Sequence, residues 1–242
     1  MTTTPPEGAG PTEPPSGAGP SERLDRFDRV ERGLHWANAV LFAVLMATAA
    51  ILYVGPLSAL VGRRGLVRQV HVVAGLALPV PVVAALAGPW RRRLRADLTT
   101  LNRWDDSDRR WLRSLGRDRA GGFAKFHPGQ KLNTAFTAGA SIVLLATGSV
   151  MHWFEPFPVE WRTGATFVHD WLAIAVFVVV AGHLRMALSD RHALRAMVRG
   201  WVPAEWARLK APRWSETPVA QQPGSRREAP GHSGASTSGS SR

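Results

Sequence analysis

Long apolar segments alternate with basic and polar segments through the middle of the chain. The apolar segments cover residues 34–54, 66–90, 132–153 and 164–188, and each is bordered by arginine- or glycine-rich sequence. A helix needs about 20 apolar residues to cross the hydrocarbon core of a bilayer, and each segment reaches that length. The pattern therefore predicts an all-α integral membrane protein built as a bundle of four helices.

The two ends of the chain have compositions that favour disorder. Residues 1–22 are mostly Pro, Gly, Thr, Ser and Glu, and residues 212–242 end in a tract of Ser, Gly and Thr. Such segments have too little apolar surface to offset the entropy that is lost on folding. We therefore expect a disordered tail over 1–22, a membrane domain over 23–211 and a mostly disordered tail over 212–242.

Charge and cysteine content narrow the class of protein. The chain has 242 residues, no cysteine and a formal charge of +12. Without thiols it cannot form a disulfide or hold a cysteine-ligated iron–sulfur cluster. The positive charge does not indicate nucleic-acid binding, because the basic residues flank the apolar segments, where they set the orientation of membrane proteins.

The distribution of basic residues predicts the topology. Residues 23–32, 91–131 and the stretch after the last apolar segment hold nearly all of them, whereas the connections 55–65 and 154–163 hold few. Positive segments stay on the cytoplasmic side. Both termini and the 91–131 loop are therefore expected on the cytoplasmic face of the plasma membrane, which is the cell inner membrane. Within that loop, a surface helix is expected near 104–115.

Histidines in the apolar segments are the candidate chemical groups. His169 and His183 are fourteen residues apart in the last segment, so both rings leave one helix face, about 21 Å apart along the axis. His35 lies at the start of the first segment, and His71 lies early in the second. With the predicted topology, His71 and His169 share the outer level, and His35 and His183 share the inner level.

Histidines paired in this way favour a haem protein. Ionisable residues within membrane spans are costly and usually functional, and two imidazoles facing each other in a helical bundle are typical axial ligands of haem iron. A single histidine at a helix end is usually interfacial, but two pairs at two depths indicate two b-type haems. The expected iron ligands are His35, His71, His169 and His183, and no catalytic residue is expected.

Other chemistry has little support in the sequence. There is no glycine-rich phosphate loop, no zinc-protease motif and no nucleophile elbow. The apolar segments contain one carboxylate, Asp170, which counts against a proton-coupled transporter because such proteins usually need buried acids. A haem-free membrane anchor or small-solute transporter remains the alternative from a different class.

Several short motifs, in this order, resemble a known family. They are Arg26-Phe27-Asp28-Arg29 with His35-Trp36, Gly129-Gln130-Lys131, Thr147-Gly148, the His169/His183 helix, and an exit segment with Trp206-Ala207-Arg208 and Pro212-Arg213-Trp214. The set resembles the gamma subunit of respiratory formate dehydrogenases, a cytochrome b556 of the b561-like di-haem membrane superfamily. The resemblance covers about residues 23–215.

The resemblance implies an electron-transfer subunit of an oxidoreductase complex. Family members bind two haems b through four histidines, which match His35, His71, His169 and His183. They pass electrons from an iron–sulfur subunit to menaquinone or another quinone, and a separate molybdenum or tungsten subunit oxidises formate. A stand-alone b561-like redox enzyme (a superoxide or quinol oxidase) and the cytochrome b subunit of a hydrogenase remain open alternatives.

The resemblance also implies a quinone site beside the inner haem. This site falls on the stretch before the third span, where His127, Gly129 and Gln130 are the matching residues. His183 is expected to contact both the inner haem and the quinone. Family members have Asn at the position of His127, and a histidine there can still hydrogen-bond a quinone carbonyl. A solvated loop histidine is the simpler alternative.

Three arginines near the expected haem levels are candidates to pair with haem propionates. Arg32 and Arg185 flank the inner level, and Arg68 flanks the outer level. The simpler explanation for each is the positive charge that sets the topology.

Overall fold

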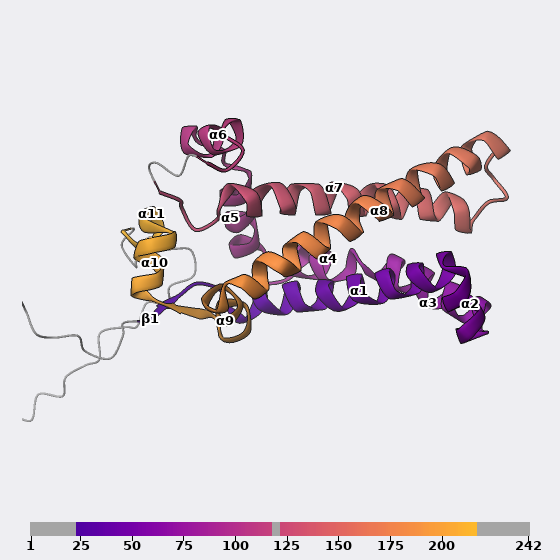
Figure 1. The fold of residues 1–242 in the computed structure, drawn as a ribbon, viewed down its shortest axis with the longest axis horizontal. Coiled ribbons are helices and arrows are strands. Elements are labelled where there is room, and N and C mark those ends of the chain that lie inside the picture. The colour runs from indigo at the N-terminus through magenta and orange to yellow at the C-terminus, as the bar shows by residue number, and fades with distance from the viewer. Residues whose placement is uncertain (1–22, 118–121, 217–242) are drawn as a thin grey trace, which may run out of the picture.

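The structure, a computed structural model, describes residues 23–117 and 122–216 (Figure 1). The tails expected to be disordered, 1–22 and most of 212–242, lie outside these residues. In chain order the elements are β1 (Arg23–Asp25), α1 (Arg29–Tyr53), α2 (Gly55–Val61), α3 (Arg64–Ala77), α4 (Val80–Ala87), α5 (Arg91–Asn102), α6 (Asp106–Arg113), α7 (Pro128–His152), α8 (Val159–Ser189), α9 (Arg191–Arg199), β2 (Trp201–Pro203), α10 (Ala204–Lys210) and α11 (Pro212–Ser215).

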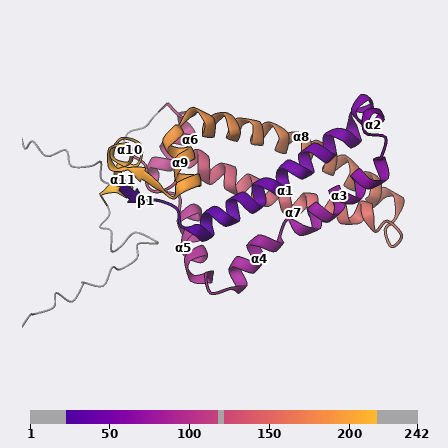
Figure 2. The ribbon, with the colours of Figure 1, turned by 90° about the horizontal axis from the view of Figure 1, so that it is seen from below.

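Four helical segments of the described chain are long and apolar enough to cross a membrane, namely α1, α3 with α4, α7 and α8. They run along the long axis of the molecule (Figures 1 and 2), with α1 packed on α3 and α7 packed on α8. This arrangement confirms the all-α bundle of four spans that the hydrophobic pattern predicts.

The first span begins earlier than its apolar segment. The Asp28 side chain accepts a hydrogen bond from the Glu31 backbone, and the Glu31 carboxylate accepts one from the Asp28 backbone. This reciprocal capping box satisfies two N–H groups that a helix end leaves unpaired, so α1 begins at Arg29. His35 therefore lies inside a formed helix and has a defined direction.

Proline residues divide the second span into α3 and α4. The backbone of Leu78 donates to Gly75, three residues back, and α4 starts at Val80. Pro79 and Pro81 have no N–H to donate and crowd the preceding turn, so the regular hydrogen-bond ladder stops there. The break lies well beyond His71, which sits in the uninterrupted α3.

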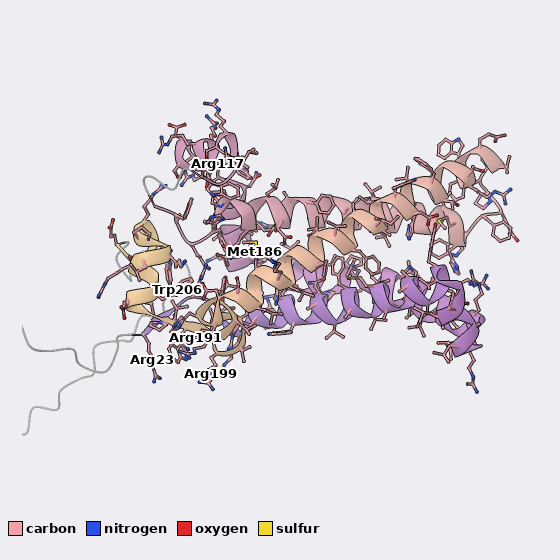
Figure 3. All side chains as sticks on the ribbon, in the orientation of Figure 1. Arg23, Arg117, Met186, Arg191, Arg199 and Trp206 are labelled. Atoms are coloured by element: carbon pink, nitrogen blue, oxygen red, sulfur yellow. The ribbon has the colours of Figure 1, made fainter. Side chains whose placement is uncertain are left out.

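The two ends of the bundle differ in structure and charge. One end, the turn end, consists of α2 and the 153–158 connection. The other, the basic end, consists of β1, β2, α5, α6, α9, α10 and α11 (Figures 1 and 2). Figure 3 shows Arg23, Arg191, Arg199 and Trp206 together at the basic end. The surface helix expected near 104–115 is present there as α6.

The basic end has a small apolar core that joins the two ends of the described chain. Strand β1 pairs antiparallel with β2, and Leu24 lies opposite Val202. The buried members of this core are Ala196, Val202, Ala207, Ala211 and Trp214. Trp214 is 5% exposed, so this core includes the last part of the described chain.

Candidate functional site

The structure brings the four candidate histidines together in two pairs at opposite ends of the bundle. At the basic end, the ring centroids of His35 on α1 and His183 on α8 are 6.2 Å apart, with 54° between the ring planes. At the turn end, those of His71 on α3 and His169 on α8 are 6.4 Å apart, with 66° between the planes. These are the partners that helix direction and depth predict.

Both separations fit two imidazoles that bind one metal ion from opposite sides. A metal–imidazole bond is about 2.0–2.1 Å long, and a five-membered ring with bonds near 1.35 Å has a radius of about 1.1 Å. Two such rings across an ion have centroids about 6–6.5 Å apart. No cluster of three metal-binding side chains occurs among the described residues. A haem macrocycle would supply further donors to an iron held by such a pair.

The basic-end pair is held by contacts between α1 and α9. The indole of Trp36 donates to the Met197 carbonyl at 3.1 Å. The Arg32 guanidinium donates to the Val198 carbonyl at 2.5 Å and to the Asp28 carbonyl at 3.1 Å. Arg32 therefore fixes α9 against the start of α1, a structural role that the sequence did not indicate.

The turn-end pair has threonine partners. Thr48 Oγ1 lies 2.8 Å from His71 Nδ1, and Thr147 Oγ1 lies 3.0 Å from His169 Nδ1. Gly148 faces the His169 ring, since a Cβ there would lie 3.3 Å from the Cε1 atom. The sequence marks Thr147-Gly148 as a motif without a role. For Thr48 the only signal is a hydroxyl in an otherwise apolar span.

Asp170 does not point toward the histidine pair. Its Oδ2 atom accepts a hydrogen bond from the Tyr53 hydroxyl at 2.5 Å. This contact joins the end of α1 to α8 at the turn end. The one carboxylate of the apolar segments is thus a helix–helix contact beside the site.

Comparison with known proteins agrees with this geometry. A sequence model of the family described as prokaryotic cytochrome b561 matches residues 26–200. The chain belongs to this family. The matched range contains all four spans and both histidine pairs, so the chain is a multi-pass membrane cytochrome that binds haem b.

Individual relatives of the chain have low sequence identity to it. The cytochrome b556(fdo) subunit of formate dehydrogenase from Escherichia coli (strain K12) is 27% identical over 205 residues, which are 80% of this chain and 92% of the relative. The formate dehydrogenase cytochrome b556 subunit from Haemophilus influenzae is 23% identical over 204 residues, which are 79% of this chain and 82% of the relative.

In this cytochrome b561 the residues expected at a quinone site form the cap of α7. His127 is the N-cap residue, its Nδ1 atom accepts from the Gly129 backbone at 3.0 Å, and its own N–H donates to Gln130 Oε1 at 3.0 Å. The ring lies edge-on to Trp111 and Phe123, with centroids 4.9 and 4.3 Å away. Capping fixes the position of the imidazole within an aromatic surrounding.

A buried charge cluster, which the sequence did not reveal, lies next to this cap. Lys125 Nζ contacts Glu31 Oε1 at 2.8 Å and Asp97 Oδ1 at 3.0 Å. The Arg26 guanidinium donates to the Lys125 carbonyl at 3.0 Å, and burial lowers the pKa of Arg26 to about 10. Lys131 pairs with Asp108 in the same way. These contacts join α1, α5, α6 and α7 beneath the basic end.

Proposed function

We propose that this cytochrome b561 is the membrane subunit of a formate dehydrogenase, which transfers electrons from an iron–sulfur subunit through two haems b to the quinone pool. One observation carries the proposal: two facing imidazole pairs, at 6.2 and 6.4 Å, lie at opposite ends of one membrane bundle. When bound, haem b supplies one-electron oxidation and reduction. The names of the E. coli and H. influenzae relatives support the assignment to formate dehydrogenase.

The residues of the chain set where each haem would be held. His35 and His183 would hold one at the basic end, and His71 and His169 would hold the other at the turn end. Since His169 and His183 belong to the single helix α8, that helix fixes their separation at about 21 Å along its axis. The apolar spans keep water away from both levels.

The charge distribution supports an orientation with the basic end in the cytoplasm. The arginine-rich helices α5, α6 and α9 all lie at that end, together with both termini of the described chain (Figure 1). Positively charged segments are retained in the cytoplasm. Alkaline phosphatase fused after residue 103 should be inactive, and the same enzyme fused after residue 156 should be active. The reverse result would overturn this orientation.

Haem stoichiometry tests the two-haem proposal. The purified chain, with its partner subunits, should contain two haems b and give a reduced-minus-oxidised haem spectrum. His71→Ala should lose the turn-end haem, and His35→Ala should lose the basic-end haem. His152→Ala is the matched control, because His152 is exposed and outside both pairs. A preparation without haem, or His71→Ala and His35→Ala variants that keep two haems, would contradict the proposal.

Co-purification tests the assignment to formate dehydrogenase. An affinity-tagged chain should bring down an iron–sulfur subunit and a subunit that contains molybdenum or tungsten. Formate added to this complex should reduce the haems. If hydrogen reduces them and formate does not, the chain is the cytochrome b of a hydrogenase instead. A haem protein that purifies without any partner would indicate the stand-alone enzyme.

We also propose that menaquinone or another quinone binds beside the α7 cap, at His127, Gly129 and Gln130. The cap lies at the basic end, as the His35–His183 pair does, and the aromatic rings around His127 suit a quinone ring. His127→Ser removes the imidazole but keeps a good N-cap residue, so it separates the two roles. It should slow quinone reduction and leave both haem spectra intact. Unchanged quinone kinetics would exclude His127 from the site.

A further inference from the structure

The two histidine pairs differ in what holds their rings. At the turn end both Nδ1 atoms lie within hydrogen-bond distance of a threonine hydroxyl, at 2.8 Å for His71 and 3.0 Å for His169. At the basic end, neither ring of the pair makes a hydrogen bond to any residue in 23–117 or 122–216. The nearest ring to His35 there is Trp36, which meets it edge-on at 5.6 Å.

The direction of the two threonine contacts follows from the rest of the geometry. Thr48 Oγ1 is 2.7 Å from the Val44 carbonyl oxygen, and Thr147 Oγ1 is 2.8 Å from the Val143 carbonyl oxygen. Two oxygen atoms at that separation need a hydrogen between them, and a carbonyl has none to give. Each hydroxyl therefore donates its single hydrogen to its own helix, and its oxygen accepts from the histidine ring.

This direction decides which ring nitrogen would be free to bind a metal. A neutral imidazole carries one hydrogen, and here Nδ1 carries it as the donor to threonine. The Nε2 lone pair of His71 and of His169 is then available to iron. A hydrogen bond from the opposite nitrogen also makes an imidazole a stronger donor to its metal.

Two further observations point to the same role. Thr48 is 8% exposed, and a buried hydroxyl in an apolar span is costly unless it is paired. Gly148 follows Thr147 directly and leaves space for the His169 ring, whose Cε1 atom would lie 3.3 Å from an added Cβ. The Thr147-Gly148 motif thus supplies an acceptor and room for one ring.

We propose that Thr48 and Thr147 are positioning residues for the turn-end haem, and that they lower its reduction potential relative to that of the basic-end haem. The inference rests on the proposed two-haem function. Stronger axial donors stabilise ferric iron over ferrous iron. The proposed quinone site lies at the basic end, so a lower potential at the turn end makes electron transfer toward that site downhill.

Conservative substitutions at both threonines test the inference. Thr48→Val and Thr147→Val keep the shape but remove the acceptor, and Thr→Ser at each position keeps the hydroxyl. Thr166→Val is the control, since the Thr166 hydroxyl bonds, among the described residues, only to the Arg162 carbonyl of its own helix. Each variant is studied by redox titration of the purified complex, and the His71→Ala and His35→Ala spectra identify which haem is which.

The double valine variant should keep two haems and raise the potential of the turn-end haem alone. The expected effect is about a tenfold change in the ratio of reduced to oxidised turn-end haem at a given potential, which corresponds to about 59 mV for one electron. The serine variants should retain the original potential, and Thr166→Val should change nothing.

The possible failures are distinguishable. A wild-type complex without two haems would contradict the proposed function itself. Two haems with unchanged potentials in the double valine variant, or a shift of the basic-end haem instead, would overturn this inference alone. If a valine substitution releases the turn-end haem, the serine variant decides: a retained haem at the original potential supports the role, and a second loss refutes it.

Discussion

Lys125 is a buried cation that links α1 to α5 at the basic end. Its ammonium group contacts Glu31 of α1 at 2.8 Å and Asp97 of α5 at 3.0 Å, and its side chain is 5% exposed. The two carboxylates are 14% and 7% exposed. Replacing Lys125 by Met keeps most of the apolar stem and removes the ammonium group, with its charge and its hydrogen bonds.

The expected loss of stability is large because both buried carboxylates lose the ammonium group that they contact directly. Removing one partner of a buried ion pair costs about 3–5 kcal/mol, and Asp97 Oδ2 already has no hydrogen-bond partner among the described residues. The Arg109–Asp106 pair is the matched control, since its side chains are 63% and 86% exposed. An exposed pair contributes at most about 1 kcal/mol.

Unfolding of the purified protein in mixed micelles with increasing denaturing detergent, followed by circular dichroism, measures both variants. Lys125→Met should lose about 3 kcal/mol or more, and Arg109→Met should lose less than about 1 kcal/mol. Adding Asp97→Asn to Lys125→Met should recover part of the loss, because it removes one uncompensated charge. Equal stabilities of Lys125→Met and Arg109→Met would refute the structural role of the cluster.

Three further changes test other parts of the structure. Gly200→Ala should speed proteolysis within 201–216, because Gly200 has φ 95° and a Cβ would lie 2.7 Å from a carbonyl oxygen of the segment after β1; an unchanged rate would contradict that packing. Gly148→Ala should lower the haem-to-protein ratio, whereas Gly139→Ala, which meets nothing within 4 Å, should not. Burial raises the pKa of Asp190, but hydrogen bonds from an α9 backbone N–H and the Trp206 indole outweigh it, and the pKa lies below its ordinary value. The stability this carboxylate contributes is therefore full above about pH 4 and is lost as the pH falls through its folded pKa. Asp190→Asn should remove that part of the acid sensitivity in a denaturation series, and a series that keeps it would assign the sensitivity to other groups.

The sequence by itself determined the spans and the depth of each histidine. Segment length decides whether an apolar helix crosses a membrane, and a fixed rise and turn per residue place His169 and His183 on one face of α8. Both properties are local, so no knowledge of the packing is needed. The start of α1 at Arg29 was not predicted, although Asp28 and Glu31 have the spacing of a capping box.

Only the tertiary structure decided which side chains surround the histidines and what holds the basic end. The hydrogen bond of Thr48 to His71 depends on how α1 is rotated against α3, and the hydrophobic pattern leaves that rotation open. Lys125 and Glu31 are 94 residues apart in the chain, and Trp214 is buried in a cluster against which Leu24, near the other end of the described chain, packs. Such contacts arise from packing between distant segments, and composition read along the chain does not reveal them.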